Sequence, residues 1–123
     1  MILIKRIDHI QLAAPFGSED EARSFFQGVL SLDEVEKPHE LKKNGGVWFS
    51  NGHIHIHVGI EEPFIPAKKA HPAFEVSDID ALASHIIEKG VSIQEDHRLP
   101  GAKRFYVNDP FGNRLEFLEW LEK

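Results

Sequence analysis

Histidine is the most prominent residue type in this chain that could do chemistry. The 123 residues include eight histidines and no cysteine. Three of the histidines alternate with isoleucines in the run His53-Ile54-His55-Ile56-His57, so they point to one face of a predicted strand. Two more, His9 and His71, lie in other alternating stretches. Because imidazole nitrogens combined with a carboxylate suit Zn²⁺, Fe²⁺, Mn²⁺, Co²⁺ or Ni²⁺, these strands are candidates for a metal site.

A suitable carboxylate lies in the last predicted hairpin. Two apolar runs flank the turn Asp109-Pro110-Phe111-Gly112-Asn113, whose residue types favour a tight reversal of the chain. In the outgoing strand, Leu115 and Phe117 point to one face while Arg114 and Glu116 point to the other. The pattern therefore predicts that Glu116 stands on the polar face of a sheet.

The first half of the chain supplies a strand, a helix and three further strands. Residues 7–13 alternate, with Ile10 and Leu12 on one face. Ser18 followed by Glu21 predicts a capping box at the start of a helix. The apolar residues of that helix recur at helical spacing, at Ala22, Phe25, Phe26, Val29 and Leu30. The strands that follow are predicted at residues 32–35, 47–49 and 53–58.

The same order of elements recurs in the second half. Residues 70–76 form an alternating strand, and a helix follows that Ser77 or Asp78 can cap and Gly90 can end. Its apolar residues match those of the first helix at a constant offset of 57 residues: Ile79, Leu82, Ala83, Ile86 and Ile87. A strand at 91–93 and the final hairpin complete the half.

This repeat predicts the fold class. We expect an α+β protein of two βαβββ modules that form a curved mixed sheet with a concave cleft, the helices covering the outer face. The modules span about residues 1–60 and 70–123, and the segment 61–69, which has no periodicity, links them. Because about 60 residues bury too little apolar surface alone, we expect the modules to form a single domain.

The polar residues of all these strands should share the face opposite the helices. Aligning the turn glycines Gly52 and Gly112 matches Glu116 with His55 to within one residue, and the alternation of the strand then favours His55, with His57 as the next alternative. The polar residues predicted on this face are His9, Gln11, His53, His55, His57, His71, Glu75 and Glu116. Trp48 and Tyr106 are predicted to pack in the sheet, although an aromatic ring on this face could also cover a ligand.

The amino-acid composition restricts which molecules this protein can bind and where in the cell we expect it. A net charge of −6 argues against a general nucleic-acid binder, and the apolar run Met1–Ile4 is too short to be a signal sequence or a membrane span. The absence of cysteine fits a cytoplasmic protein. One basic cluster, Arg98, Lys103 and Arg104, is either a solvated loop or a clamp for an anionic small-molecule substrate.

Three stretches of this sequence resemble the vicinal oxygen chelate superfamily, which includes glyoxalase I, extradiol dioxygenases, fosfomycin-resistance transferases and bleomycin-resistance proteins. They are Ile7-Asp8-His9-Ile10-Gln11-Leu12, residues 70–82 and residues 105–116, which include Asp109-Pro110-Phe111-Gly112-Asn113-Arg114-Leu115-Glu116. The resemblance implies a divalent metal, Zn, Fe, Mn, Ni or Co, bound by His9, His71 and Glu116. Glyoxalase-like members add a carboxylate or an amide on the last strand of the first half, where this chain has a histidine, His55. Members of this length often act as homodimers, so we expect a homodimer, with the cleft formed within one chain or across the dimer.

The resemblance also implies a function. We expect a metal-dependent enzyme of the lyase or isomerase, thiol transferase or dioxygenase type, acting on a small oxygen-rich molecule. Glu116 would act at the metal, Glu75 is a candidate general base, and Gln11, Arg98 and Arg104 are candidates for binding the substrate. The alternative is a bleomycin-resistance-like protein that binds a cationic drug without catalysis.

Overall fold

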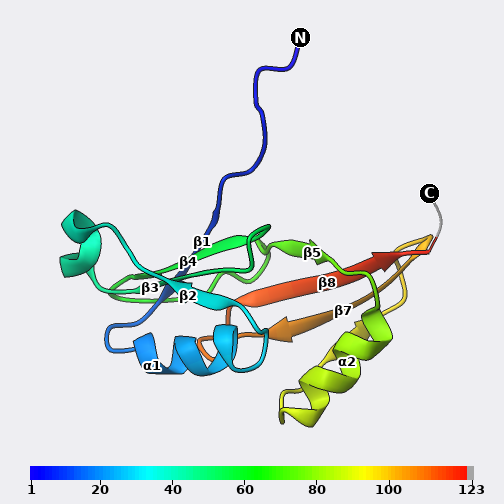
Figure 1. The fold of residues 1–123 in the computed structure, drawn as a ribbon. Helices are drawn as coiled ribbons and strands as arrows, with labels where there is room; N and C mark the ends of the chain where they lie inside the picture. The colour runs from blue at the N-terminus through cyan, green and yellow to red at the C-terminus, as the bar shows by residue number, and fades with distance from the viewer. Residues whose placement is uncertain (122–123) are drawn as a thin grey trace. The chain divides into compact units, whose positions relative to one another are not determined.

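The computed structural model describes residues 1–121, and contacts between residues divide the chain into two halves, Met1–Phe64 and Ile65–Lys123. The boundary falls inside the predicted linker 61–69. Each half follows the order strand, helix, then three strands, as the repeat predicts (Figure 1). The chain thus has the predicted α+β class with two βαβββ modules, and each module forms its own four-stranded sheet.

The first half contains a sheet with the order β1-β4-β3-β2. β1 runs parallel to β4, and the other neighbours are antiparallel. A short α-helix continues directly into a π-helix. The elements are β1 (Ile10–Ala14), α1 (Glu19–Ala22), the π-helix Arg23–Gln27, β2 (Asp33–Val35), a 3₁₀ helix (His39–Asn44), β3 (Val47–Ser50) and β4 (His55–Ile60).

The second half repeats this topology with the order β5-β8-β7-β6, and β5 runs parallel to β8. Asp78 caps its helix, because the carboxylate accepts a hydrogen bond from the Ala81 amide, and Gly90 follows the helix with φ of +84°. The elements are β5 (Ala73–Glu75), α2 (Ile79–Glu88), β6 (Gln94–Asp96), β7 (Ala102–Asn108) and β8 (Arg114–Trp120).

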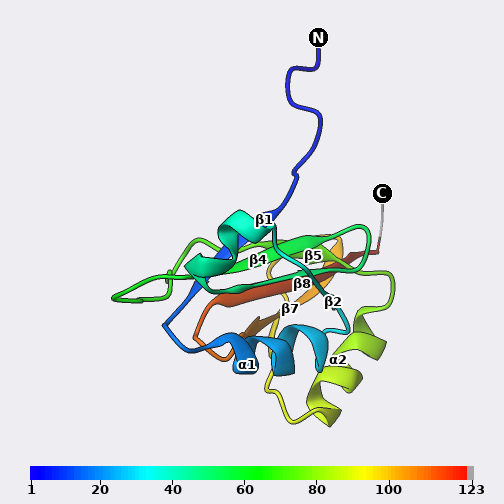
Figure 2. The same cartoon turned by 60° about the vertical axis from the view of Figure 1, so that its left-hand side comes forward.

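In each half the apolar residues of alternating strand positions are buried. In the first half, Phe26 of the π-helix is fully buried and its ring stacks on that of Phe49, with centroids 5.3 Å apart. In the second half, Phe117 of β8 lies between Phe74 and Phe105, with ring centroids 5.5 and 5.6 Å away. These clusters leave the other strand positions, which are mostly polar, for the opposite face of each sheet. Figure 2 shows the same strands from a second direction.

Several predicted boundaries are wrong. Strand pairing begins at Ile10 rather than residue 7 and at Ala73 rather than residue 70, so His9 and His71 lie just before their strands. Similarly, His53 precedes β4, and the strand predicted at 91–93 lies at Gln94–Asp96. These are places where alternation continues in the sequence beyond the last paired residue.

The predicted capping box at Ser18 is also wrong. Ser18 has φ of −96° and ψ of 3°, outside the extended region from which a cap side chain reaches the first helical amides. Its hydroxyl is buried and makes no hydrogen bond to any described residue. The neighbouring Glu19 instead accepts a hydrogen bond from the Gly46 amide at 2.9 Å, which joins the helix to the start of β3.

Within residues 1–121, no helix combines the length and the apolar composition needed to cross a membrane.

Candidate metal and substrate site

In the second half, His71 and Glu116 come together although 45 residues separate them in sequence. His71 Nε2 lies 2.8 Å from Glu116 Oε1, and the Glu116 side chain is buried. The parallel pairing of β5 with β8 brings them together, because Ala73 is opposite Glu116 and the Glu116 amide donates to the Pro72 carbonyl. The short segment before β5 therefore holds His71 beside the carboxylate.

The contacts of both ring nitrogens restrict what can lie between His71 and Glu116. Nδ1 lies 2.8 Å from the Lys69 carbonyl oxygen, which only accepts, so this nitrogen carries a hydrogen. In a neutral ring, Nε2 then has a lone pair that faces another acceptor, the Glu116 carboxylate. A positive species, either a proton or a metal ion, must lie between these two atoms. A backbone carbonyl bonded to Nδ1 is also the usual support of a metal-binding histidine.

His9 in the first half has the same kind of support. Its Nδ1 lies 2.9 Å from Asp8 Oδ1, a carboxylate oxygen that accepts, so Nε2 is the nitrogen left for a ligand. This hydrogen bond also lowers the pKa of Asp8. Donors suited to a divalent metal are therefore present in both halves. In His9 and His71 an acceptor oxygen holds Nδ1, as metal binding through Nε2 favours.

His9 lies at one end of a stack of three rings. Its ring lies 4.0 Å from that of His57, and His57 in turn lies 3.7 Å from Trp48 with the rings 1° from parallel. Burial, followed by electrostatic repulsion from His9, lowers the pKa of His57. His57 is therefore a neutral ring between two aromatic neighbours at neutral pH.

The strand registers show which positions correspond between the halves. Trp48 and Gln11 pair with His57, just as Tyr106 and Ala73 pair with Glu116. The counterpart of Glu116 is thus His57, and the predicted correspondence with His55 is wrong. His55 pairs with Ser50, is exposed, and takes the position that Arg114 has in the second half. His57, which the sequence left as the alternative to His55, is therefore the histidine that the register identifies.

Arg104 is the basic residue closest to this carboxylate. Its Nη1 donates to Glu116 Oε2 at 3.1 Å and its Nη2 donates to Asp96 at 3.3 Å. Its Nε is buried and has no hydrogen-bond partner among the described residues. Because a buried donor without an acceptor is costly, this atom is suited to an acceptor supplied by a ligand.

The other members of the predicted basic cluster are engaged elsewhere. Arg98 is exposed and binds Asp96 with its guanidinium, and these hydrogen bonds hold the pKa of Asp96 well below its ordinary value. Lys103 forms an ion pair with Asp80 at 2.7 Å. A three-residue clamp is therefore not formed, and Arg104 alone of the three contacts Glu116.

The remaining predicted residues lie at two places. Glu75 is exposed on β5, two positions beyond Ala73 and on the same face as Glu116. Gln11 lines a hollow of about 220 Å³ in the first half. Trp48 and Lys37 also line it, and the 3₁₀ helix contributes Leu41 and Asn44. The sequence analysis missed Lys37 and this helix. The positions of Trp48 and Gln11 on either side of His57 needed the strand register.

Within residues 1–121, the structure contains no preformed group of three or more histidine and carboxylate side chains arranged to hold an ion. The pairs His9–His57 and His71–Glu116 belong to different halves, and each is described within its own half. The predicted ligands are thus partly brought together: His71 with Glu116, and His9 with a second histidine. Whether all of them bind one ion remains a prediction.

Comparison with known proteins identifies a family for this sequence. The family described as the glyoxalase/bleomycin resistance protein/dioxygenase superfamily matches residues 6–117. A crystal structure of a glyoxalase family protein from Bacillus anthracis is 50% identical, with a TM-score of 0.94 and 98% of each chain covered. None of the curated proteins matches this sequence.

More distant structures share the fold. The lactoylglutathione lyase of Agrobacterium tumefaciens is 22% identical, with a TM-score of 0.75 and 96% of each chain covered. The antibiotic binding protein TnmS3 of a Streptomyces species is 18% identical, with a TM-score of 0.73, and the match covers 95% of this chain and 99% of that one. The family match over most of the chain, with the close similarity to the Bacillus protein, confirms the resemblance noted from the sequence: this chain belongs to the glyoxalase/bleomycin resistance protein/dioxygenase superfamily.

Proposed function

We propose that this protein is a metal-dependent enzyme in which His9, His71 and Glu116 hold a divalent cation, with His57 rather than His55 as the fourth protein ligand. The observation that carries the proposal is the geometry of His71, whose Nδ1 is held by the Lys69 carbonyl while Nε2 faces Glu116 Oε1 at 2.8 Å. Zn²⁺, Fe²⁺, Mn²⁺, Ni²⁺ and Co²⁺ all accept this mixture of imidazole and carboxylate donors.

The ion, when bound, would act as a Lewis acid on the oxygens of a small oxygen-rich substrate. The protein side chains would bind the substrate and accept a proton from it. Arg104 would hold the Glu116 carboxylate through Nη1 and donate its buried Nε to an anionic oxygen of the substrate. Glu75, on the same face as Glu116, would accept a proton, and Gln11 with Trp48 would form one wall of the substrate site. Lyase or isomerase, thiol transfer and dioxygenase reactions are all compatible with these roles.

Metal analysis tests this proposal directly. The protein is purified without an affinity tag, and its bound metal is measured by mass spectrometry. We expect one ion per chain in the wild type and loss of that ion in His71→Ala and Glu116→Gln. His53→Ala is the matched control, because His53 is exposed and precedes β4, and it should retain the metal. A wild-type protein with little metal after incubation with each of the five cations, or a His71→Ala variant with undiminished metal, would contradict the proposal.

A second function is supported by a different observation, the stack of His9, His57 and Trp48 beside the hollow that Gln11 and Lys37 line. Aromatic faces of this kind bind flat or cationic molecules without a metal, which suits a drug-binding protein of the bleomycin-resistance type. Thermal unfolding separates the two functions. A rise in melting temperature with bleomycin, and none with divalent metals, would favour the binding protein.

We further propose that the protein is a cytoplasmic homodimer. Membership of the superfamily supports both points, since its members are typically cytoplasmic and often dimeric. The absence of cysteine agrees with a reducing compartment. Sedimentation equilibrium tests the dimer.

A further inference from the structure

A half-buried lysine lines the hollow of the first half, and the proposed function gives it no role. Lys37 lies between β2 and the 3₁₀ helix, and its Nζ donates to the Gly45 carbonyl. An ammonium group carries three hydrogens, so this bond leaves two for other acceptors. The Glu36 carboxylate, next to it in sequence, pairs with Lys42 instead, at 3.5 Å. Within residues 1–121 no carboxylate pairs with Lys37, so its charge is available to a ligand.

The rest of the lining offers apolar and aromatic surface. None of the described residues that line the hollow is acidic, and three are aliphatic: Leu41, Val58 and Ile60. Trp48 contributes an indole, and its ring stacks on that of His57 at 3.7 Å, so the hollow meets the other face or the edge of the indole. Aromatic surface of this kind packs well against planar groups.

Gln11 supplies a second donor, and Gly59 makes room for it. A Cβ atom at Gly59 would lie 2.6 Å from Gln11 Nε2, closer than such atoms approach, so glycine is what lets the amide lie against β4 here. Nε2 donates one hydrogen to the Leu12 carbonyl at 3.2 Å, and its second hydrogen is left for a ligand. Lys37 and Gln11 thus line one hollow with donors that suit a carboxylate.

We propose that the hollow is a subsite for a small planar carboxylate, whose acid group Lys37 and Gln11 bind and whose flat body packs against Trp48. The volume of about 220 Å³ suits one ring with its acid group, since pockets for whole drug-sized ligands begin near roughly 300 Å³. Lys37 is then a specificity-determining residue that favours acids over neutral and cationic molecules. The use of this subsite by a substrate rests on the proposed function, whereas the binding of a carboxylate there does not.

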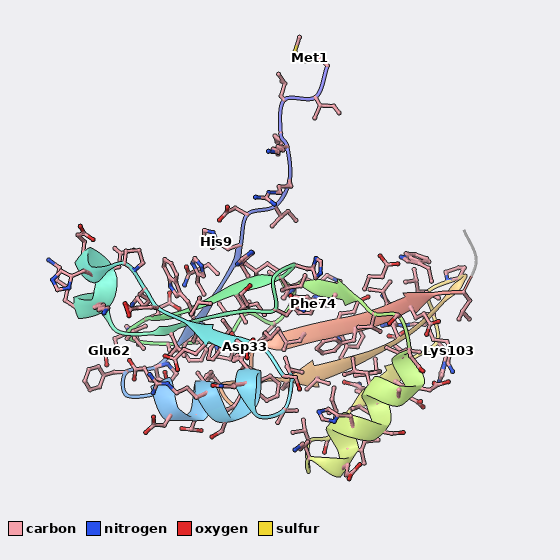
Figure 3. The ribbon with its side chains drawn as sticks, viewed as in Figure 1. Met1, His9, Asp33, Glu62, Phe74 and Lys103 are labelled. Atoms are coloured by element: carbon pink, nitrogen blue, oxygen red, sulfur yellow. The ribbon has the colours of Figure 1, made fainter. Side chains whose placement is uncertain are left out.

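The hollow lies beside one of the proposed metal ligands. Trp48 both stacks on His57 and lines the hollow, so the two share one wall. Burial and then repulsion from His9 lower the pKa of His57, and the charge of Lys37 adds to this effect. Figures 2 and 3 show the 3₁₀ helix, drawn in teal, on the side of the first sheet opposite α1. A substrate held at His57 therefore has the hollow beside it for its acidic end.

Heteronuclear NMR of the labelled protein in EDTA tests the subsite without any contribution from a metal ion. The chain has two tryptophans, and Trp120→Phe identifies which indole N–H signal belongs to Trp48. The probes are benzoate and its neutral isostere benzamide. We expect benzoate to shift the Trp48 signal and to bind roughly 10-fold or more tightly than benzamide, because its hydrogen bond to the ammonium group is charge-assisted.

Substitution of Lys37 separates a binding role from a structural one. Lys37→Met removes the charge and keeps the aliphatic stem, so the affinity for benzoate should fall roughly 10-fold while that for benzamide changes by less than about 2-fold. Lys37→Arg keeps the charge and should retain a preference for benzoate. Lys43→Met is the matched control, because Lys43 is exposed on the 3₁₀ helix and does not line the hollow, and it should bind both probes as the wild type does.

Three results would overturn the inference: equal affinity of the wild type for the two probes, a Trp48 signal that benzoate does not move, or a Lys37→Met variant that still prefers benzoate. Loss of both probes together in Lys37→Met would overturn it as well, because Lys37 would then serve only to hold the loop at Gly45. Metal content is measured separately, so failure of the proposed metal centre and failure of this subsite are distinguishable.

Discussion

The rings of Trp48 and His57 lie 1° from parallel with their centroids 3.7 Å apart, across the antiparallel pair β3 and β4. His57 also stacks on His9, so the His57 side chain of β4 contacts both β3 and the segment before β1. The contact therefore contributes to stability as well as to the proposed site.

The first prediction concerns this stack. His57→Ala removes both ring contacts and should lower the free energy of unfolding by about 1 kcal/mol, the usual size of a cross-strand aromatic pair. Urea unfolding in EDTA measures the change without any contribution from metal. His53→Ala lies outside β4 and should be neutral; equal effects of the two substitutions would show that the stack contributes nothing.

The second prediction concerns Arg104, which holds Glu116 Oε2 but is not itself a metal ligand. Arg104→Gln should weaken metal binding by about 10- to 100-fold, the usual effect of removing a group that orients a ligand. Competition with a chromophoric chelator gives the affinity. Arg98→Gln is the control, because Arg98 binds Asp96 at the surface and does not contact Glu116. Unchanged affinity in Arg104→Gln would show that Glu116 needs no support from this guanidinium.

The third prediction is a pH dependence that arises from Asp96. Hydrogen bonds from Arg98, and further ones from Arg104, depress its pKa in the folded protein, whereas in the unfolded chain it should be about 3.9. The stabilisation by this carboxylate is therefore complete above the unfolded value and is lost as the pH falls toward the folded one. Asp96→Asn should be less stable than the wild type at neutral pH, and the difference should shrink below about pH 4. A difference that stays constant across an acid titration of unfolding would contradict this assignment.

The fourth prediction tests the cap of α2. Asp78→Ala removes the acceptor of the Ala81 amide and should cost about 1 kcal/mol of stability. Thermal unfolding measures the loss. Ser77→Ala, at the position that the sequence left as an equal alternative, should change stability by less than about 0.5 kcal/mol. The reverse ranking would assign the cap to Ser77.

Periodicity was sufficient to predict the order of elements in both halves, because alternation and helical spacing follow directly from burying one face of each element. It could not predict where strand pairing stops. His9 and His71 continue the alternation of their strands in sequence, yet pairing starts at Ile10 and Ala73. A strand ends where its neighbour ends, and a single-strand pattern does not contain that information.

The correspondence of Glu116 with His55 failed for a related reason. The hairpin of the first half connects its strands through residues 51–54, four residues, whereas the second uses 109–113, five residues. Aligning the two turn glycines ignores this difference and matches Glu116 with Ile56, one residue from both His55 and His57, so the alternation of the strand could not choose between the two histidines. Only the register, with Trp48 opposite His57 and Tyr106 opposite Glu116, identifies the counterpart.

The contacts of His71 and Arg104 were beyond sequence reasoning as well. The sequence suggested that His71 and Glu116 share a face, but the Lys69 carbonyl that fixes the histidine ring is a backbone group. Similarly, the basic cluster gave no sign that Arg98 would pair with Asp96, or that the Nε of Arg104 would have no acceptor among residues 1–121.

The substitution of His57 for a carboxylate at the position matching Glu116 has an electrostatic consequence. A dication surrounded by His9, His57, His71 and Glu116 would keep one positive charge, because His57 is neutral at neutral pH and only Glu116 is negative. A site with carboxylates in both positions would have no net charge. The proposed centre would therefore discriminate among small molecules by their charge, favouring an anionic oxygen over a neutral carbonyl before shape is compared.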